Sequence, residues 1–210
     1  MNLKYHLQFY LLLSLLPIVS AHADAFDNTL TEARTVFLQA VDGNKRAVRD
    51  ATKRFKKLSH NNPQEPVLLA YLGACTTLQG RDALNNINKR RLTEEGLDKI
   101  DRALNQLADN KYYPAYKRLD TMLVAASSYI HIPAFFNRHD KGKQLLAQIL
   151  DDQGFDGMVA GFKAATYMAA ALISHGDNDK DAYRRYLDLI VKTDPNGRDG
   201  RLASEMIKEL

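Results

Sequence analysis

The sequence predicts an all-α protein built from antiparallel helix pairs, and three observations lead to this prediction. After Ala25, apolar residues recur at the three- and four-residue spacing of a helix almost everywhere along the chain. The strict alternation of apolar and polar residues that marks a half-buried strand is missing from the sequence. Turn-forming residues interrupt the apolar pattern at short intervals, and short connections favour antiparallel neighbours.

These interruptions divide the chain into nine expected helices. Gly43, Gly80 and Gly176 lie in turn signals, and Pro66 suits a first helical turn, where a proline removes no hydrogen bond. Thr93 is the expected N-cap of the fourth helix, because its hydroxyl can accept from a free backbone N–H. The predicted helices cover residues 27–41, 45–60, 66–79, 93–109, 114–131, 134–152, 157–175, 179–193 and 199–209.

The first 23 residues have the features of a secretory signal peptide. Lys4 supplies a positive start, residues 9–19 form an apolar segment, and Ala21 and Ala23 provide small residues for a cleavage site before Asp24. The apolar segment is too short to span a bilayer. We therefore expect an exported protein, periplasmic rather than secreted, whose mature part is one domain over residues 24–210 and does not span a membrane.

Composition allows one sizeable core and not several domains, since the 210 residues are 45% hydrophobic and 26% charged. Basic residues gather in residues 45–57 and 89–91. Such runs suit nucleic acid or anionic lipid, but solvated helix faces explain them more simply, and we expect no nucleic-acid partner. Cys75 is the only cysteine and cannot form an internal disulfide, so the core alone must hold the fold.

Two parts of the chain share the spacing of a 34-residue repeat of helix pairs. Leu38 and Leu72 lie at equivalent positions of two such units. Small residues stand where two helices would cross, large ones would fill the groove between units, and a proline closes each unit. The matching residues are Ala51, Phe55, Leu58, Pro63, Leu69, Leu72, Gly73 and Thr76 in the first part, and Tyr167, Ala170, Ala171, Ser174, Tyr183, Leu187, Ile190 and Pro195 in the second.

Through these residues the chain resembles the tetratricopeptide-repeat family over residues 27–80 and 164–210. The resemblance implies a tetratricopeptide-like α/α superhelix of antiparallel helix pairs with an atypical middle section. In that section, residues 81–95 look like an insertion, and residues 114–152 fit only as a generic helix pair. An unrelated helical bundle with chance spacing is the alternative.

The resemblance also implies a binding surface, because the first helices of this family line a concave face that holds a peptide or a partner helix. The Lys and Asn residues with which some members clamp a peptide carboxylate are missing here, which leaves an apolar groove. Alternatively, the middle helices fill this groove, since residues 67–77, 119–132 and 158–173 are apolar nearly all round. The expected partner-binding residues are Val36, Ala40, Val67, Ala70, Ala74, Met168 and Leu172, with Ala33 and Ala165 beside them.

The sequence contains no constellation typical of catalysis or metal binding. The histidines are not paired on one helix face, and Cys75 lies in an apolar helix, where a thiol is inert. Asp177, Asp179 and Asp181 resemble the start of a calcium loop, but Ala182 stands where that loop requires glycine. We therefore expect turn and cap roles for these acids, and no cofactor.

Aromatic residues beside basic ones surround the middle section, which is typical both of binding surfaces and of buried helix junctions. Together these observations predict a non-catalytic periplasmic adaptor that holds a protein partner. A carrier of a small apolar or lipid-like ligand is the alternative, and an enzyme acting on cell-envelope polymers has only location and scattered acids in its favour. The aromatic residues are Tyr112, Tyr113, Tyr116, Tyr129, Phe135 and Phe136.

Overall fold

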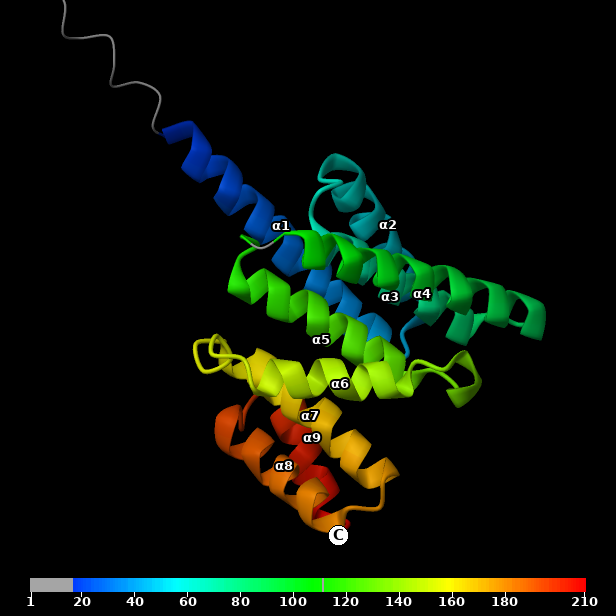
Figure 1. Ribbon diagram of the computed structural model, residues 1–210, viewed down its shortest axis with the longest axis vertical. Coiled ribbons are helices and arrows are strands. Elements are labelled where there is room, and N and C mark those ends of the chain that lie inside the picture. Colours follow the sequence, from blue (N-terminus) through cyan, green and yellow to red (C-terminus); the bar gives the residue numbers. More distant parts are fainter. Residues whose placement is uncertain (1–16, 111) are drawn as a thin grey trace, which may run out of the picture.

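The computed structural model of the protein describes residues 17–110 and 112–210, with side chains from Phe26 onward. All regular elements of these residues are helices, which confirms the predicted all-α class (Figure 1). The helices are α1 (Pro17–Val41), α2 (Lys45–Asn61), α3 (Pro66–Asp82), α4 (Asn86–Asp109), α5 (Ala115–His131), the short 3₁₀ helix η1 (Ala134–Phe136), α6 (His139–Leu150), α7 (Ala160–Gly176), α8 (Lys180–Thr193) and α9 (Arg198–Lys208).

Consecutive helices form pairs, and the pairs stack as they do in a helical repeat. α1 pairs with α2, α3 with α4, α5 with α6 and α7 with α8, while α9 packs on the last pair. The helices that come first in their pairs, which we call the first helices, are α1, α3, α5 and α7, and α9 continues this series. Each of them contacts the next, so that they form a continuous row. Each second helix packs against the first helix that follows it. This order confirms the repeat-like arrangement of helix pairs.

The predicted start of the fourth helix, at residue 93 near the end of the insertion-like residues 81–95, is wrong. These residues lengthen the α3–α4 hairpin instead, and α4 begins at Asn86, well before the predicted start. Asn85 caps α4, since its side-chain oxygen accepts a hydrogen bond from the backbone N–H of Asn88. Thr93, the predicted cap, is buried inside α4, where its hydroxyl lies beside Gly80 of α3.

The predicted helix over residues 134–152 is interrupted near its start. η1 ends at Phe136 and α6 begins at His139. Between them Asn137 adopts the left-handed conformation, with φ of 54°, which a continuous right-handed helix does not allow. The first helix begins at Pro17, ten residues before its predicted start, and the remaining predicted helices agree with the structure to within a few residues.

Most of the predicted signal peptide, residues 1–16, lies outside the described residues. The backbone is helical from Pro17, so α1 runs through the predicted cleavage point before Asp24. None of the described helices combines the length and the apolar character that crossing a bilayer requires.

The first three helices enclose an aromatic cluster. The rings of Phe55 and Tyr71 are stacked with centroids 4.7 Å apart, and Phe37 meets Tyr71 edge-on at 5.1 Å. Such contacts combine large buried area with a preferred ring geometry. At the other end of the chain, Leu187 and Ile190 of α8 are fully buried in a separate cluster between α7 and α9.

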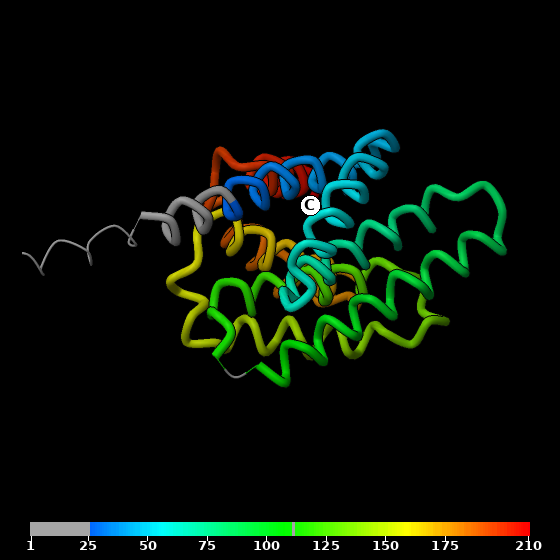
Figure 2. The backbone as a smooth tube through the Cα atoms, turned by 90° about the horizontal axis from the view of Figure 1, so that it is seen from above, coloured from blue at the N-terminus to red at the C-terminus, as the bar shows by residue number. Residues whose placement is uncertain are grey.

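The last helix returns to the first pair. The Arg198 guanidinium at the start of α9 donates to Asp42 in the turn after α1, with Nε 3.0 Å from Oδ1. Seen from above, α1 and α9 lie on one side of the molecule (Figure 2). The row of first helices is therefore curved, and its two ends meet through this ion pair.

α3 and α4 approach each other more closely than ordinary side chains permit. A Cβ atom built on Gly73 would lie 2.7 Å from the carbonyl oxygen of Gly96, and one built on Gly96 would lie 2.6 Å from the carbonyl oxygen of Gly73. The two glycines face each other, so neither backbone can move away without opening the pair. This observation matches the predicted role of Gly73 at a helix crossing.

Gly73→Ala should lower the free energy of unfolding by about 1–3 kcal/mol, because the added methyl overpacks the α3–α4 contact. Urea unfolding followed by circular dichroism measures this change. Gly176→Ala is the control, since a Cβ there would have no atom within 4 Å. That variant should be unchanged or more stable by about 0.5 kcal/mol, and equal stability of the two variants would contradict the packing explanation.

Candidate functional site

Most of the predicted partner-binding residues lie in the core. Those on α3 belong to the cluster that also contains Val124 of α5, so a middle helix covers them. Over α3 the structure therefore favours the alternative in which the chain itself fills the groove. Val36 of α1 and Leu172 of α7 are partly exposed and can be reached from solvent. Ala165 has the same intermediate exposure as Val36 and Leu172, and the buried positions are Ala33, Ala40, Val67, Ala70, Ala74 and Met168.

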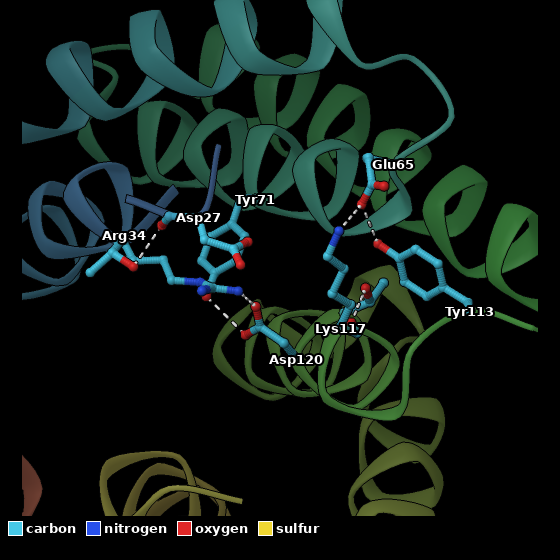
Figure 3. A network of polar contacts seen from close by, with 9 residues as sticks. Asp27, Arg34, Glu65, Tyr71, Tyr113, Lys117 and Asp120 are labelled. Carbon is cyan, nitrogen blue, oxygen red and sulfur yellow. Dashed lines mark hydrogen bonds and ion pairs between the residues drawn. The ribbon is translucent and has the colours of Figure 1, made fainter. Parts of the chain in front are cut away.

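A buried polar network connects three first helices (Figure 3). The carboxyl group of Asp120 on α5 accepts a hydrogen bond from the hydroxyl of Tyr71 on α3, at 2.9 Å. Its other oxygen forms an ion pair with the Arg34 guanidinium of α1. Asp120 is 8% exposed and Tyr71 6%. α1, α3 and α5 are therefore fixed to one another by directional bonds as well as by apolar packing.

Burial dominates the electrostatics of this network. It raises the pKa of Asp120, although Arg34 and Tyr71 both favour the ionised carboxylate. Burial also raises the pKa of Tyr71 well above its ordinary value, and the neighbouring Asp120 carboxylate adds to that shift. Burial alone would lower the pKa of Arg34, but the charges and hydrogen bonds of Asp120 and Tyr71 together outweigh it, and the pKa rises. The guanidinium thus stays charged beside a carboxyl group that desolvation makes costly to ionise.

A second network of the same kind lies at the start of α5. Oε2 of Glu65, the N-cap residue of α3, accepts from the hydroxyl of Tyr113 at 2.9 Å and from the Lys117 ammonium at 3.0 Å (Figure 3). The Lys117 ammonium also lies 5.0 Å from the ring centre of Phe26 on α1, a cation–π contact. Burial, followed by the charge of Glu65, raises the pKa of Tyr113.

A third network lies at the other end of α5. The hydroxyl of Tyr129 donates to Asp101 of α4 at 2.7 Å. Arg138 and Lys141 pair with the same carboxylate, at 2.9 Å and 2.6 Å. Each of the three networks thus joins a tyrosine hydroxyl, a carboxylate and a basic side chain, and each includes a residue of α5. The pattern was not predicted from the sequence.

α5 is also linked to the segment that follows α6. The Arg118 guanidinium makes two hydrogen bonds to the Asp152 carboxylate, of 2.8 Å and 3.1 Å, and the backbone N–H of Gly154 donates to the same group at 2.9 Å. Such two-pronged pairs fix orientation as well as distance. The hydrogen bonds from Arg118 lower the pKa of Asp152.

Five of the six aromatic residues of the middle section divide into two groups, and the sixth, Phe136, is partly buried. Tyr113 and Tyr129 are buried and belong to the networks, which bears out packing for these two. Tyr112, Tyr116 and Phe135 are 97%, 47% and 67% exposed and remain available as binding residues. Sequence alone could not separate the two groups, because their members alternate along the same short segments.

Other candidate chemistry finds little support in the described part of the chain. Residues 17–110 and 112–210 contain no group of three or more His, Cys, Asp or Glu side chains placed to hold a metal ion. Asp179 caps α8, as expected, and the Asp177 carboxylate pairs with the Lys143 ammonium. Cys75 is buried, and this burial raises the pKa of its thiol to about 12, so little nucleophilic thiolate forms near neutral pH.

Comparison of the chain with models of protein families, with curated protein sequences and with solved structures finds no match. Membership of the tetratricopeptide-repeat family therefore stays a prediction from the spacing of residues.

Asp120→Ala should lower the free energy of unfolding by about 3 kcal/mol, because it leaves the Arg34 guanidinium and the Tyr71 hydroxyl without their shared acceptor. Chemical denaturation measures this loss. Asp98→Ala changes an exposed acid on α4 and should cost less than about 0.5 kcal/mol. If both substitutions cost the same small amount, the network does not hold the helices together.

The Arg118–Asp152 pair should stabilise the fold in a pH-dependent way. Because the folded-state pKa of Asp152 is lowered from 3.8, its stabilisation is present above that pH and is lost as the pH falls through the lowered value. Asp152→Asn should therefore destabilise the protein at pH 7, and its difference from the parent should shrink in acid. Asp151→Asn, an exposed neighbour, controls for the change in net charge. A difference that stays constant in acid would contradict the assignment.

Proposed function

We propose that this protein is an exported, periplasmic adaptor that holds a protein partner on its row of first helices and catalyses no reaction. The observation that carries the proposal is the network around Asp120, which fixes α1, α3 and α5 to one another. A surface that is already rigid before binding loses less conformational entropy when a partner docks. Export is supported by the signal-like features of the first 23 residues.

Binding is favoured over catalysis because the acids of the three networks, of which Asp120 is buried and the other two partly buried, already have partner side chains. Asp120, Glu65 and Asp101 each accept a tyrosine hydroxyl and each pair with a basic side chain. A general acid or base needs a free atom within hydrogen-bond reach of a substrate. Satisfied carboxylates between packed helices are better suited to holding those helices in place.

An adaptor is also favoured over a carrier of an apolar ligand. The apolar faces of α3 and α5 pack on each other, so the interior that a carrier would offer is occupied by residues such as Val67 and Val124. Two surface hollows, of about 400 and 370 Å³, are open to solvent rather than enclosed. An open hollow would cover less of an apolar ligand than the closed interior that a carrier needs.

The partner is proposed to contact the exposed part of the first helices. Val36 on α1 and Leu172 on α7 are the predicted binding residues that reach the surface. Tyr116 on α5 and Tyr112 just before it are exposed as well, and tyrosine is enriched in protein interfaces. These residues offer apolar contact area on the helices that the networks hold in place.

Crosslinking in living cells tests this proposal. A photoreactive amino acid at Val36 or at Leu172 should capture one dominant protein in the compartment where the chain resides. The same amino acid at Arg102, an exposed position on α4, is the matched control and should capture little. Equal capture from all three positions, or capture of nothing from Val36 and Leu172, would count against a partner on the first helices.

A further inference from the structure

The outer face of α2 carries an unusual concentration of positive charge. Seven Lys and Arg residues stand against the single acid Asp50 in this helix, although the whole chain has a formal net charge of only +4. The inner face is apolar and buried, with Phe55 at its centre. Six of the basic side chains are exposed and form no ion pair within residues 17–110 and 112–210, namely Lys45, Arg46, Arg49, Lys53, Lys56 and Lys57.

Two large aliphatic side chains protrude close to the start of this helix. Leu84, between α3 and α4, is 97% exposed, and Ile87 in the first turn of α4 is 81% exposed. The end of the α3–α4 hairpin that carries them projects from the body of the molecule (Figures 1 and 2). Single exposed apolar residues are common. Two neighbouring ones at a projecting end expose apolar surface to water, and this exposure indicates a site that binds another apolar surface.

A surface hollow of about 370 Å³ joins the basic and the apolar features. Lys45 and Arg49 of α2 line one side, and Leu84 lines the other. The hollow contains one acid, Asp82, whose carboxylate is paired with Arg81 at 2.8 Å. The cations of α2 therefore have no competing carboxylate in the hollow and face an aliphatic side chain.

We propose that this face is a docking surface for an anionic phospholipid bilayer. Leu84 and Ile87 would enter the boundary between headgroups and acyl chains, while Lys45 and Arg49 bind headgroup phosphates. A nucleic acid could also bind the basic side chains of α2 through its phosphates. It offers no apolar layer, however, for two projecting aliphatic side chains. The inference is independent of the proposed adaptor function, since the adaptor surface lies on α1, α5 and α7.

Sedimentation with vesicles tests the electrostatic part. The protein should bind vesicles of phosphatidylcholine mixed with phosphatidylglycerol and not vesicles of phosphatidylcholine alone. Lys45→Glu combined with Arg49→Glu should weaken binding at least about 25-fold, since each lost cation costs about fivefold. Arg185→Glu with Lys192→Glu, in the hollow on α8, is the matched charge control and should bind within about threefold of the parent.

The aliphatic part has a direct optical test, because the chain contains no tryptophan. Leu84→Trp places the only indole at the projecting end, and its fluorescence should shift to the blue when anionic vesicles are added. Val159→Trp, at another exposed apolar position, is the control and should not shift. All variants share one N-terminus, so the apolar segment at residues 9–19 contributes equally to each.

Three results would overturn the proposal. One is an absence of binding to anionic vesicles. Another is that the double variant Leu84→Ser, Ile87→Ser binds the vesicles as well as the parent does, and that the parent binds heparin or duplex DNA equally well. This result would indicate a general polyanion site. The third is binding that Lys45→Glu with Arg49→Glu does not weaken. Unchanged thermal unfolding midpoints of these surface variants show that the fold is intact in each comparison.

Discussion

The buried carboxyl group of Asp120 is the constraint on which the arrangement of the first five helices depends. A carboxyl group removed from water needs partners, and its partners stand 49 and 86 residues earlier in the sequence, on α3 and α1. Apolar side chains tolerate small sliding movements, whereas a hydrogen bond is lost when a helix slides by part of a turn. The equivalent bonds around Glu65 and Asp101 fix α5 at both of its ends.

The side chains between the helices thus satisfy one another, whereas some surface side chains have no partner within the described part of the protein. In the middle section, tyrosines, acids and bases satisfy one another between helices, and the close approach of Gly73 and Gly96 holds the α3–α4 hairpin. On the outside, six of the seven cations of α2 and the aliphatic side chains of Leu84 and Ile87 lack such partners among the residues that the structure describes. A rigid frame that displays unpaired surfaces is suited to binding, and two surfaces on different helices allow two different partners.

Much of this fold could be predicted, because local signals define helices. The turn around Gly43 predicted the start of α2, and Pro66 predicted the start of α3, both to within a few residues. The start of α4 was wrong because Asn85 and Thr93 are both plausible caps, and only the packing of Thr93 against Gly80 decides between them. The distinction depends on contacts between helices, which local sequence does not contain.

The candidate site was harder to predict for the same reason. Periodicity places Ala70 and Ala74 on the inner face of α3, but it cannot show that α5 covers them. One available signal was missed. Asp120 stands at the edge of an apolar run, and an acid on a buried helix face requires partners. The identity of those partners, Arg34 and Tyr71, follows only from the tertiary structure.

Hydrogen exchange of the backbone amides in the parent protein and in Asp120→Ala tests most directly whether this carboxyl group couples the first helices. Coupling predicts faster exchange in α1 and α3 as well as in α5, because the lost bonds join these three helices. Exchange in α8 and α9 should be unchanged. Faster exchange confined to the turn of α5 around residue 120 would contradict it and would leave apolar packing alone to hold the row.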